Sequence, residues 1–174
     1  DGLRASEVTL DNVKIGADAV LGEVDNGFAI VDDVSQQGIA ALAAEAVGCM
    51  SVLLDTTNEY VKTRKQFGQP SGKFQVIQHR MADMFIACEE ARSMSYLATL
   101  RLDDPNPMER ARASAAAKVQ IGKSLVYVSQ QAVQLHGGMG MTDELNVGHY
   151  FKRLTMIDTM LGDQDYHLKR YAEM

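Results

Sequence analysis

The stretch RKQFGQP at residues 64–70, followed by FQVIQ at residues 74–78, decides how this chain is organised. Apolar residues at helical spacing end here, and a second series with the same spacing begins just beyond. Glycine and proline between the two series favour a turn over a continued helix. The sequence therefore predicts a long helix over 28–64, a tight break, and a second helix over about 74–102.

A second break, QLHGGMG at residues 134–140, divides the rest of the chain. The stretch DDPNP at 103–107 stops the second helix, because its prolines remove backbone donors. An alanine-rich helix is then predicted over 108–135, with shorter helices over 143–173. Three long helices and a broken fourth, joined by short loops, predict an all-α, antiparallel four-helix bundle over residues 26–174.

Residues 5–22 follow a different pattern, in which polar and apolar residues alternate around a turn at Asp11-Asn12. Alternation with a period of two predicts β-strands. A two-stranded piece is marginal in water, so it needs further strands beside it. We therefore interpret residues 1–25 as the trailing strands of a truncated β domain.

Composition excludes several classes of protein. The net charge of −6 and the pI near 5.2 argue against a nucleic-acid partner, which would need a basic face. Cys49 and Cys88 lack any CxxC partner, so we expect small buried residues in a reducing compartment and no metal site. No apolar run is expected to approach membrane-spanning length. These features together predict a cytoplasmic protein.

The first break carries side chains that suit an anionic, planar ligand. The guanidinium of Arg64 pairs well with phosphate, although a cation in the last turn of a helix also serves as a plain cap. Phe67 can pack on a flat ring or plug the end of the bundle. Gln75 opens the next helix, where free backbone N–H groups attract anions.

The second break allows a similar pair of interpretations. Its GGxG run follows a helix and not a strand, so a dinucleotide-binding βαβ unit is excluded. Gly137 and Gly138 can simply cap a helix. They can also leave the main chain open to a flat ligand, with Gln134 bonding to its edge. His136, His149 and His167 show no metal-binding spacing, so structural or surface roles are predicted for them.

Both breaks, together with the lead-in GEVDNGF at residues 22–28, resemble the carboxy-terminal domain of the acyl-CoA dehydrogenases in order and spacing. The resemblance implies an FAD-dependent oxidoreductase of fatty acid metabolism that acts on acyl-CoA and passes electrons to an acceptor flavoprotein. It also implies a tetramer, a dimer of dimers, in which FAD sites are shared between subunits. The residues that it assigns to FAD across the interface are Arg64, Gln66, Phe67 and Gln75, and those that it assigns to the adenosine part are Gln134, Gly137 and Gly138.

The end of the chain, from GHYFKR at 148–153 to Gly162-Asp163, is similar to the small subunit of pimeloyl-CoA-type dehydrogenases. The family reaction needs a carboxylate to remove the proton α to the thioester. The position of the usual Glu is Leu161 here, the position used by a minority is Gly38, and the CoA-binding Arg corresponds to Ile39.

Asp163 is the nearest candidate for the missing base, because a carboxylate in a cleft can serve as one. Its place before a helical segment predicts an N-cap equally well. Three hypotheses follow: an acyl-CoA dehydrogenase that introduces an α,β double bond, a non-catalytic subunit that shares FAD sites in a heteromeric dehydrogenase, and a purely structural bundle. The third hypothesis leaves the residues of the two breaks without a shared function, so it ranks last.

Overall fold

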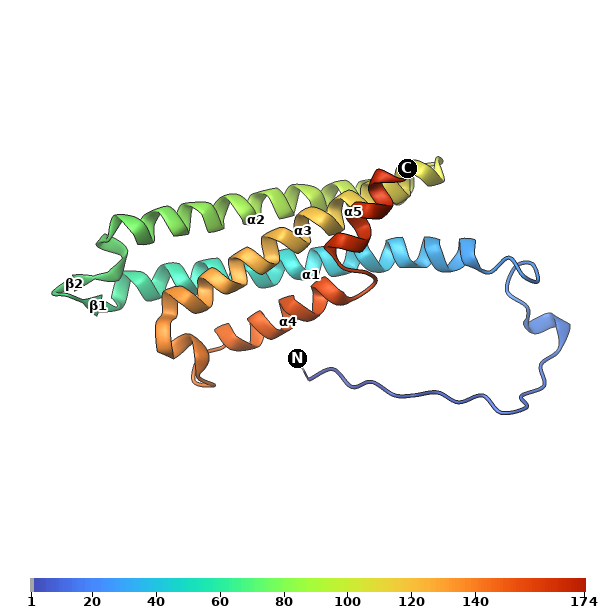
Figure 1. Ribbon diagram of the computed structural model, residues 1–174, viewed down its shortest axis with the longest axis horizontal. Coiled ribbons are helices and arrows are strands. Elements are labelled where there is room, and N and C mark those ends of the chain that lie inside the picture. Colours follow the sequence, from blue (N-terminus) through green and yellow to red (C-terminus); the bar gives the residue numbers. More distant parts are fainter. Residues whose placement is uncertain (1) are drawn as a thin grey trace.

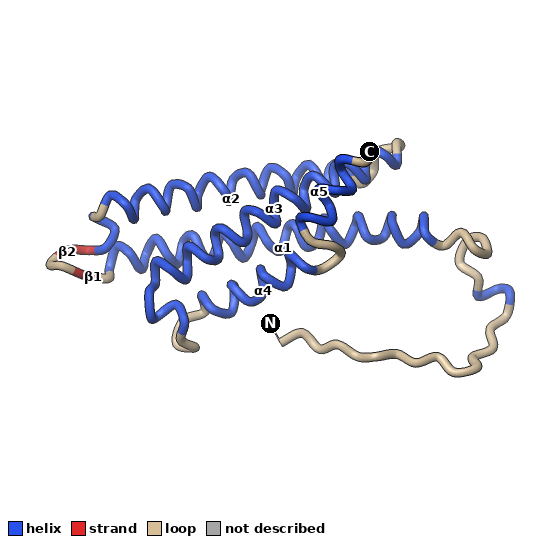
Figure 2. Tube along the Cα trace, in the orientation of Figure 1, coloured by secondary structure: helices blue, strands red, loops and turns tan. Residues whose placement is uncertain are grey.

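The computed structural model describes residues 2–174 as an elongated helical bundle with an extended amino-terminal segment (Figure 1). The long helices are α1 (Phe28–Thr63), α2 (Gln75–Arg101) and α3 (Pro107–His136), and α4 (Val147–Thr159) and α5 (Gln164–Ala172) complete the bundle. Helices α1 to α4 each run opposite to the helix before them (Figure 2). The predicted all-α bundle with a broken fourth helix is thus confirmed.

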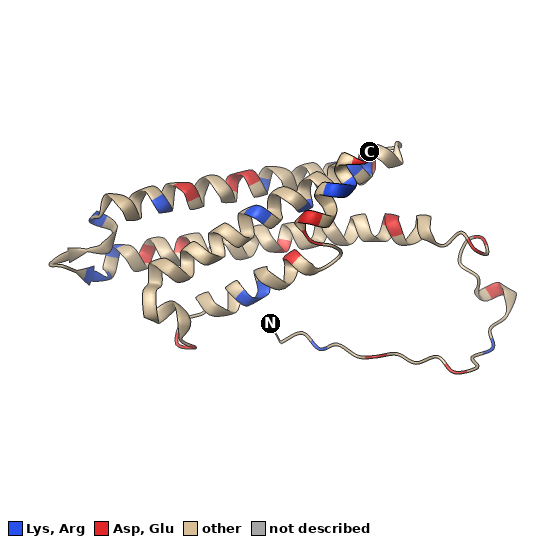
Figure 3. Ribbon diagram, in the orientation of Figure 1, with Lys and Arg blue, Asp and Glu red and all other residues tan. Residues whose placement is uncertain are grey.

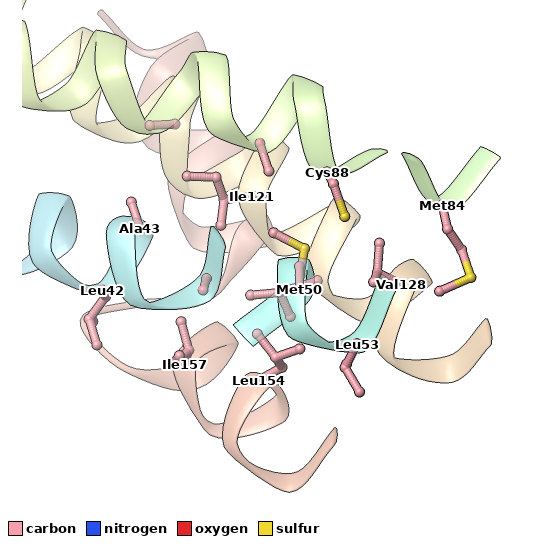
Figure 4. Close-up of a cluster of buried hydrophobic side chains, with 14 of the residues drawn as sticks. Leu42, Ala43, Met50, Leu53, Met84, Cys88, Ile121, Val128, Leu154 and Ile157 are labelled. Carbon is pink, nitrogen blue, oxygen red and sulfur yellow. The ribbon is translucent and has the colours of Figure 1, made fainter. Parts of the chain in front are cut away.

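The core lies between α1, α2, α3 and α4, where their apolar faces meet (Figure 4). Small residues on α3 let its neighbours approach closely, and larger side chains fill the remaining space. The largest of these, each almost fully buried, are Met50, Leu53, Met84, Ile121, Leu154 and Ile157. Cys88 is buried among them, and burial raises the pKa of its thiol to about 11, as expected for an unreactive core residue.

Helix α1 corrects one expectation from the sequence. By length and composition alone it is apolar enough to cross a membrane, contrary to the prediction that no run approaches that length. In the structure, ten of its residues, from Gln36 to Val61, are buried against the other helices. A core helix of a bundle satisfies the same criterion, and the packing of α1 matches that case.

The amino-terminal segment contains a short 3₁₀ turn, η1 (Ala17–Ala19), and no strand among residues 2–27. Its apolar residues are exposed, including Val8, Leu10 and Ile15. A strand requires backbone partners, and no other described strand pairs with this segment. The strands predicted over 5–22 therefore do not form in this structure, and the assignment of residues 1–25 to a β domain stays a prediction.

A two-residue hairpin joins α1 to α2. Strand β1 (Lys65–Gln66) pairs antiparallel with β2 (Gln69–Pro70), and this is the only sheet among residues 2–174. Phe67 and Gly68 form the turn with φ values of 52° and 81°, which is the type I′ pattern that suits tight hairpins. The base is closed by Ser71, whose backbone N–H donates to the Arg64 carbonyl at 2.8 Å.

Gly122 in the middle of α3 gives a direct test of the packing. A Cβ at this position would lie 2.7 Å from Asp158 Oδ1 and 3.1 Å from Gln164 Cβ. We expect Gly122→Ala to lower the free energy of unfolding by roughly 1–3 kcal/mol, because overpacking outweighs the helix propensity of alanine. The matched control is Gly48→Ala in α1, where a Cβ meets nothing within 4 Å. Denaturant unfolding that shows equal effects at both positions would contradict this packing.

Candidate functional site

The two glycine-bearing breaks, about sixty residues apart in sequence, meet at one end of the bundle. Together they line a pocket of about 450 Å³, which we call the hairpin pocket. Its lining residues are Tyr60, Arg64, Gln66, Ser71, Gln134, Leu135, His136, Gly137, Gly138 and Met139. Five of the seven predicted cofactor-binding residues therefore line one cavity. They can do so because α1 and α3 end side by side at the same end of the bundle.

One wall of the hairpin pocket is the end of α3 and the 3₁₀ turn η3 (Gly137–Met141). Gly137 caps α3 with φ 59°, a conformation that favours glycine. A Cβ at Gly137 or Gly138 would meet no heavy atom within 4 Å, so bare backbone faces open space. Gln134 stands exposed on the last turn of the helix. This wall can accept a flat group against the main chain.

The opposite wall is the end of α1 and the start of the hairpin. Arg64 is the C-cap of α1, and its backbone N–H donates to the Tyr60 carbonyl at 2.8 Å. Its side chain is exposed, and so is that of Gln66. Lysine and arginine residues gather at this end of α1 and in the hairpin (Figure 3). The wall therefore offers planar and cationic donors suited to phosphate.

Two predicted residues lie outside the hairpin pocket. Phe67 is 92% exposed at the hairpin tip, where only an edge contact with Phe74 is seen, with ring centroids 6.2 Å apart. Gln75 is the exposed first residue of α2. Neither side chain plugs the bundle, so the alternative core role for Phe67 is wrong. Both side chains are exposed outside the hairpin pocket.

Five lining residues were not predicted for the site, and two of them, Tyr60 and His136, contact each other. Tyr60 lies one helical turn before Arg64, and its ring stacks on buried His136 with centroids 4.3 Å apart. His136 Nδ1 donates to the Ala132 carbonyl at 2.8 Å, which leaves Nε2 as a buried acceptor without a partner among the described residues. The four-residue spacing from Tyr60 to Arg64 was the available signal for Tyr60, and the sequence carried none for His136. Stacking across two helices is invisible in sequence.

The positions of the family base meet at the other end of the bundle. Leu161 and Ile39 line a second pocket of about 360 Å³, which we call the α5 pocket. A Cβ at Gly38 would lie 2.8 Å from Leu161 Cδ1, so the two base positions face each other directly. Both carry residues that cannot accept a proton. The space between them is filled by the leucine side chain.

Asp163, the predicted alternative base, is the N-cap of α5. Its carboxylate accepts a hydrogen bond from the Tyr166 backbone N–H at 2.8 Å. The side chain is exposed, and it is not among the residues that line the α5 pocket. The capping interpretation is therefore what the geometry shows. A catalytic role for Asp163 stays a prediction, which Asp163→Asn tests.

The buried histidines predict a loss of stability in mildly acidic solution. Burial lowers the pKa of both His136 and His167. Below the ordinary histidine pKa near 6.5, the unfolded chain takes up protons that the folded chain does not bind. The free energy of unfolding should therefore fall as the pH drops below about 6.5, by at most about 1.4 kcal/mol per pH unit for each histidine.

Urea unfolding at a series of pH values between 5 and 8 measures this dependence. His167→Gln should flatten the decline, because one of the two groups is removed. Exposed His149 provides the control, and His149→Gln should leave the decline as it is. If the free energy of unfolding falls equally steeply with falling pH in both variants, His167 does not contribute to the acid sensitivity.

Fold and pocket define the chain as a helical domain with a pocket between a hairpin and a glycine-rich helix cap. The acyl-CoA dehydrogenase C-terminal domain family matches residues 25–174. The chain belongs to this family, which acts on acyl-CoA, binds FAD and passes electrons to an electron-transferring flavoprotein. The bundle expected from the resemblance is thereby confirmed.

Three relatives illustrate the match. The human mitochondrial short-chain specific acyl-CoA dehydrogenase is 32% identical over 158 residues, which is 90% of this chain and 38% of that protein. The structure of butyryl-CoA dehydrogenase from Megasphaera elsdenii has a TM-score of 0.86 at 31% identity and covers 92% of this chain and 42% of its own. The structure of PigA with FAD and proline has a TM-score of 0.77 at 30% identity, over 83% and 37% of the two chains. This chain thus spans less than half of each relative.

Proposed function

We propose that this chain belongs to an FAD-dependent acyl-CoA dehydrogenase that introduces an α,β double bond into a CoA thioester. The observation that carries the proposal is the hairpin pocket, where both breaks supply side chains to one cavity. Arg64 and Gln66 offer donors to phosphate oxygens on one wall. Gly137 and Gly138 offer open backbone to the adenosine part on the other. These residues fit the polar end of FAD, and the flavin ring of that cofactor supplies hydride acceptance.

The separation of the two pockets supports sharing of FAD between chains. The α5 pocket includes Ile39 near the start of α1, whereas the hairpin pocket begins at Tyr60 near its end. At about 1.5 Å per residue, the helix from Ile39 to Tyr60 spans roughly 32 Å. A dinucleotide is much shorter than this distance. FAD bound by its adenosine end at the hairpin pocket therefore reaches the α5 pocket of another chain, which supports the proposed dimer of dimers.

The second candidate function is a non-catalytic subunit of a heteromeric dehydrogenase. Leu161 packed against Gly38 favours it, because both positions for the base are occupied without a carboxylate. Asp163 is engaged as a helix cap, so it offers no simple substitute. Under this proposal the chain holds FAD in the hairpin pocket, and a different chain removes the α-proton in its own acyl site.

The two candidates differ in what the purified protein does alone. Under the first candidate the purified protein binds FAD and reduces an artificial acceptor with butyryl-CoA by itself. Under the second it binds FAD but turns over only after co-expression with a dehydrogenase chain that carries the Glu. Turnover by the protein alone would eliminate the non-catalytic role. Absence of bound flavin both alone and in the co-expressed complex would eliminate the dehydrogenase proposal as a whole.

The acyl specificity is a further part of the proposal. The similarity of residues 148–163 to the small subunit of pimeloyl-CoA-type dehydrogenases favours a dicarboxylic acyl chain, and the relatives above do not test that finer resemblance. The rates of the co-expressed complex with pimeloyl-CoA and with butyryl-CoA measure this specificity. Preference for butyryl-CoA would remove the pimeloyl assignment.

A further inference from the structure

The turn between α4 and α5 holds two consecutive residues in left-handed backbone conformations. Leu161 has φ 57° and Gly162 has φ 92°. Glycine adopts such angles freely, but a leucine pays a steric penalty because its Cβ crowds the following carbonyl. A strained residue of this kind persists only where its surroundings over-determine it. The contacts around the turn show what holds Leu161 in place.

His167 makes the contact that reaches Leu161 itself. Its side chain is 1% exposed, and Nε2 lies 2.8 Å from the Leu161 carbonyl oxygen. A carbonyl oxygen only accepts, so Nε2 carries the proton and donates it. Gly162 makes room for the ring, because a Cβ there would lie 3.0 Å from Nε2 and 2.5 Å from Tyr166 Cδ1. The imidazole thus reaches the main chain at the strained residue.

Lys118 of α3 secures the other end of the turn. This lysine is 4% exposed, and its Nζ donates to the carbonyls of Ile157 at 2.7 Å and Asp158 at 2.8 Å. Those carbonyls belong to the last turn of α4, where intrahelical donors are absent. Lys118 from α3 and His167 from α5 therefore both donate hydrogen bonds to main-chain carbonyls at this turn. The Leu161 side chain extends across to Gly38, where a Cβ would lie 2.8 Å from Leu161 Cδ1.

We propose that His167 is a positioning residue that fixes the left-handed backbone of residue 161 and so aims its side chain at Gly38 inside the α5 pocket. The inference rests on the proposed function, because the α5 pocket matters to acyl-CoA only under that proposal. His167 does not touch the acyl chain in this account. It acts through the Leu161 carbonyl, and the donor on Nε2 is the feature that matters.

Two variants separate the donor from the bulk of the ring. His167→Gln keeps an amide Nε2 at a similar distance from the backbone, whereas His167→Leu keeps apolar bulk and removes the donor. In NMR spectra of the protein, we expect a contact between the Leu161 methyl and Gly38 Hα in the parent and in His167→Gln. In His167→Leu this contact should be lost.

Amide exchange gives a second readout. The Tyr166 and His167 amides bond to Asp163 just after the turn. Their exchange should quicken by roughly tenfold in His167→Leu, as expected when one hydrogen bond is lost from the closed turn. Circular dichroism confirms that both variants are folded. A methyl contact that survives in both variants, or that is lost in both, would overturn the role of the donor.

Acyl-CoA binding is measured separately by calorimetry on the same proteins. Absence of binding by the parent would refute the proposed function, while the methyl contact and exchange rates still decide the positioning role. A loss of butyryl-CoA affinity in His167→Leu that His167→Gln restores supports the inference. Equal affinity in all three proteins would overturn the link between His167 and the α5 pocket.

Discussion

If the chain is a non-catalytic subunit, replacing Leu161 with glutamate should give the purified protein a dehydrogenase activity that the parent lacks. The new carboxylate would face Gly38, where there is space only because that residue has no side chain. The pocket around it includes the apolar side chains of Val31 and Ile39 together with the paired charges of Asp32 and Arg170. A general base of this kind contributes roughly 10²–10⁴-fold to a proton-abstraction step.

The matched control for this variant is Leu161→Gln, which has the same shape and accepts no proton. Reduction of an artificial acceptor with butyryl-CoA should rise by at least about 100-fold in Leu161→Glu over both Leu161→Gln and the parent. Equal rates in the glutamate and glutamine variants, with FAD bound in both, would show that position 161 does not reach the α-carbon. That result would also remove the non-catalytic interpretation built on Leu161.

Loss of the Arg64 side chain should weaken FAD binding by roughly 10- to 100-fold, the range for a hydrogen bond to a charged group. Arg64 stands at the wall of the hairpin pocket opposite Gly137 and Gly138. Arg64→Lys should fall between Arg64→Ala and the parent, because an ammonium is not planar and cannot bond to phosphate in a bidentate manner. Flavin fluorescence during titration of the apoprotein measures the affinity.

Lys65 next to it provides the control for charge alone. This residue is exposed in β1 and does not line the hairpin pocket. Lys65→Ala should change FAD affinity less than twofold at physiological salt, where exposed charges are largely screened. Similar losses in the two alanine variants would mean that a diffuse basic surface, and not the guanidinium of Arg64, binds the phosphates.

Most of the fold could be predicted because its signals are local. Helix α3 begins where Asn106 accepts a hydrogen bond from the Met108 backbone N–H at 3.0 Å, with Pro107 in the first turn. Its end at Gly137 follows the same local logic. The alternation over residues 5–22 was equally local, yet it forms no strand here, because strands need partners from elsewhere. A helix pairs its backbone N–H and C=O groups within one segment, whereas a strand needs a partner strand. That difference explains why the predicted helices form here and the predicted strands do not.

Candidate site residues were predictable only as separate motifs. Arg64 and Gln134 each had a bland interpretation as part of a helix end, and nothing local required them to share a cavity. Phe67 and Gln75 show the reverse, since motif membership placed them in the site but the structure leaves them outside the hairpin pocket. Contact between distant residues depends on helix lengths and on how the helices pack, which no short motif records.

By itself, the sequence determined the helical bundle, the two glycine-bearing breaks and the absence of a glutamate at position 161. Periodicity, caps and turn residues act within a few positions of one another, so they can be recognised without coordinates. Only the tertiary structure decided that the breaks share one pocket, that Leu161 fills the space over Gly38, and that buried His167 holds the strained turn. Those facts depend on side chains from separate helices packing within a few ångströms.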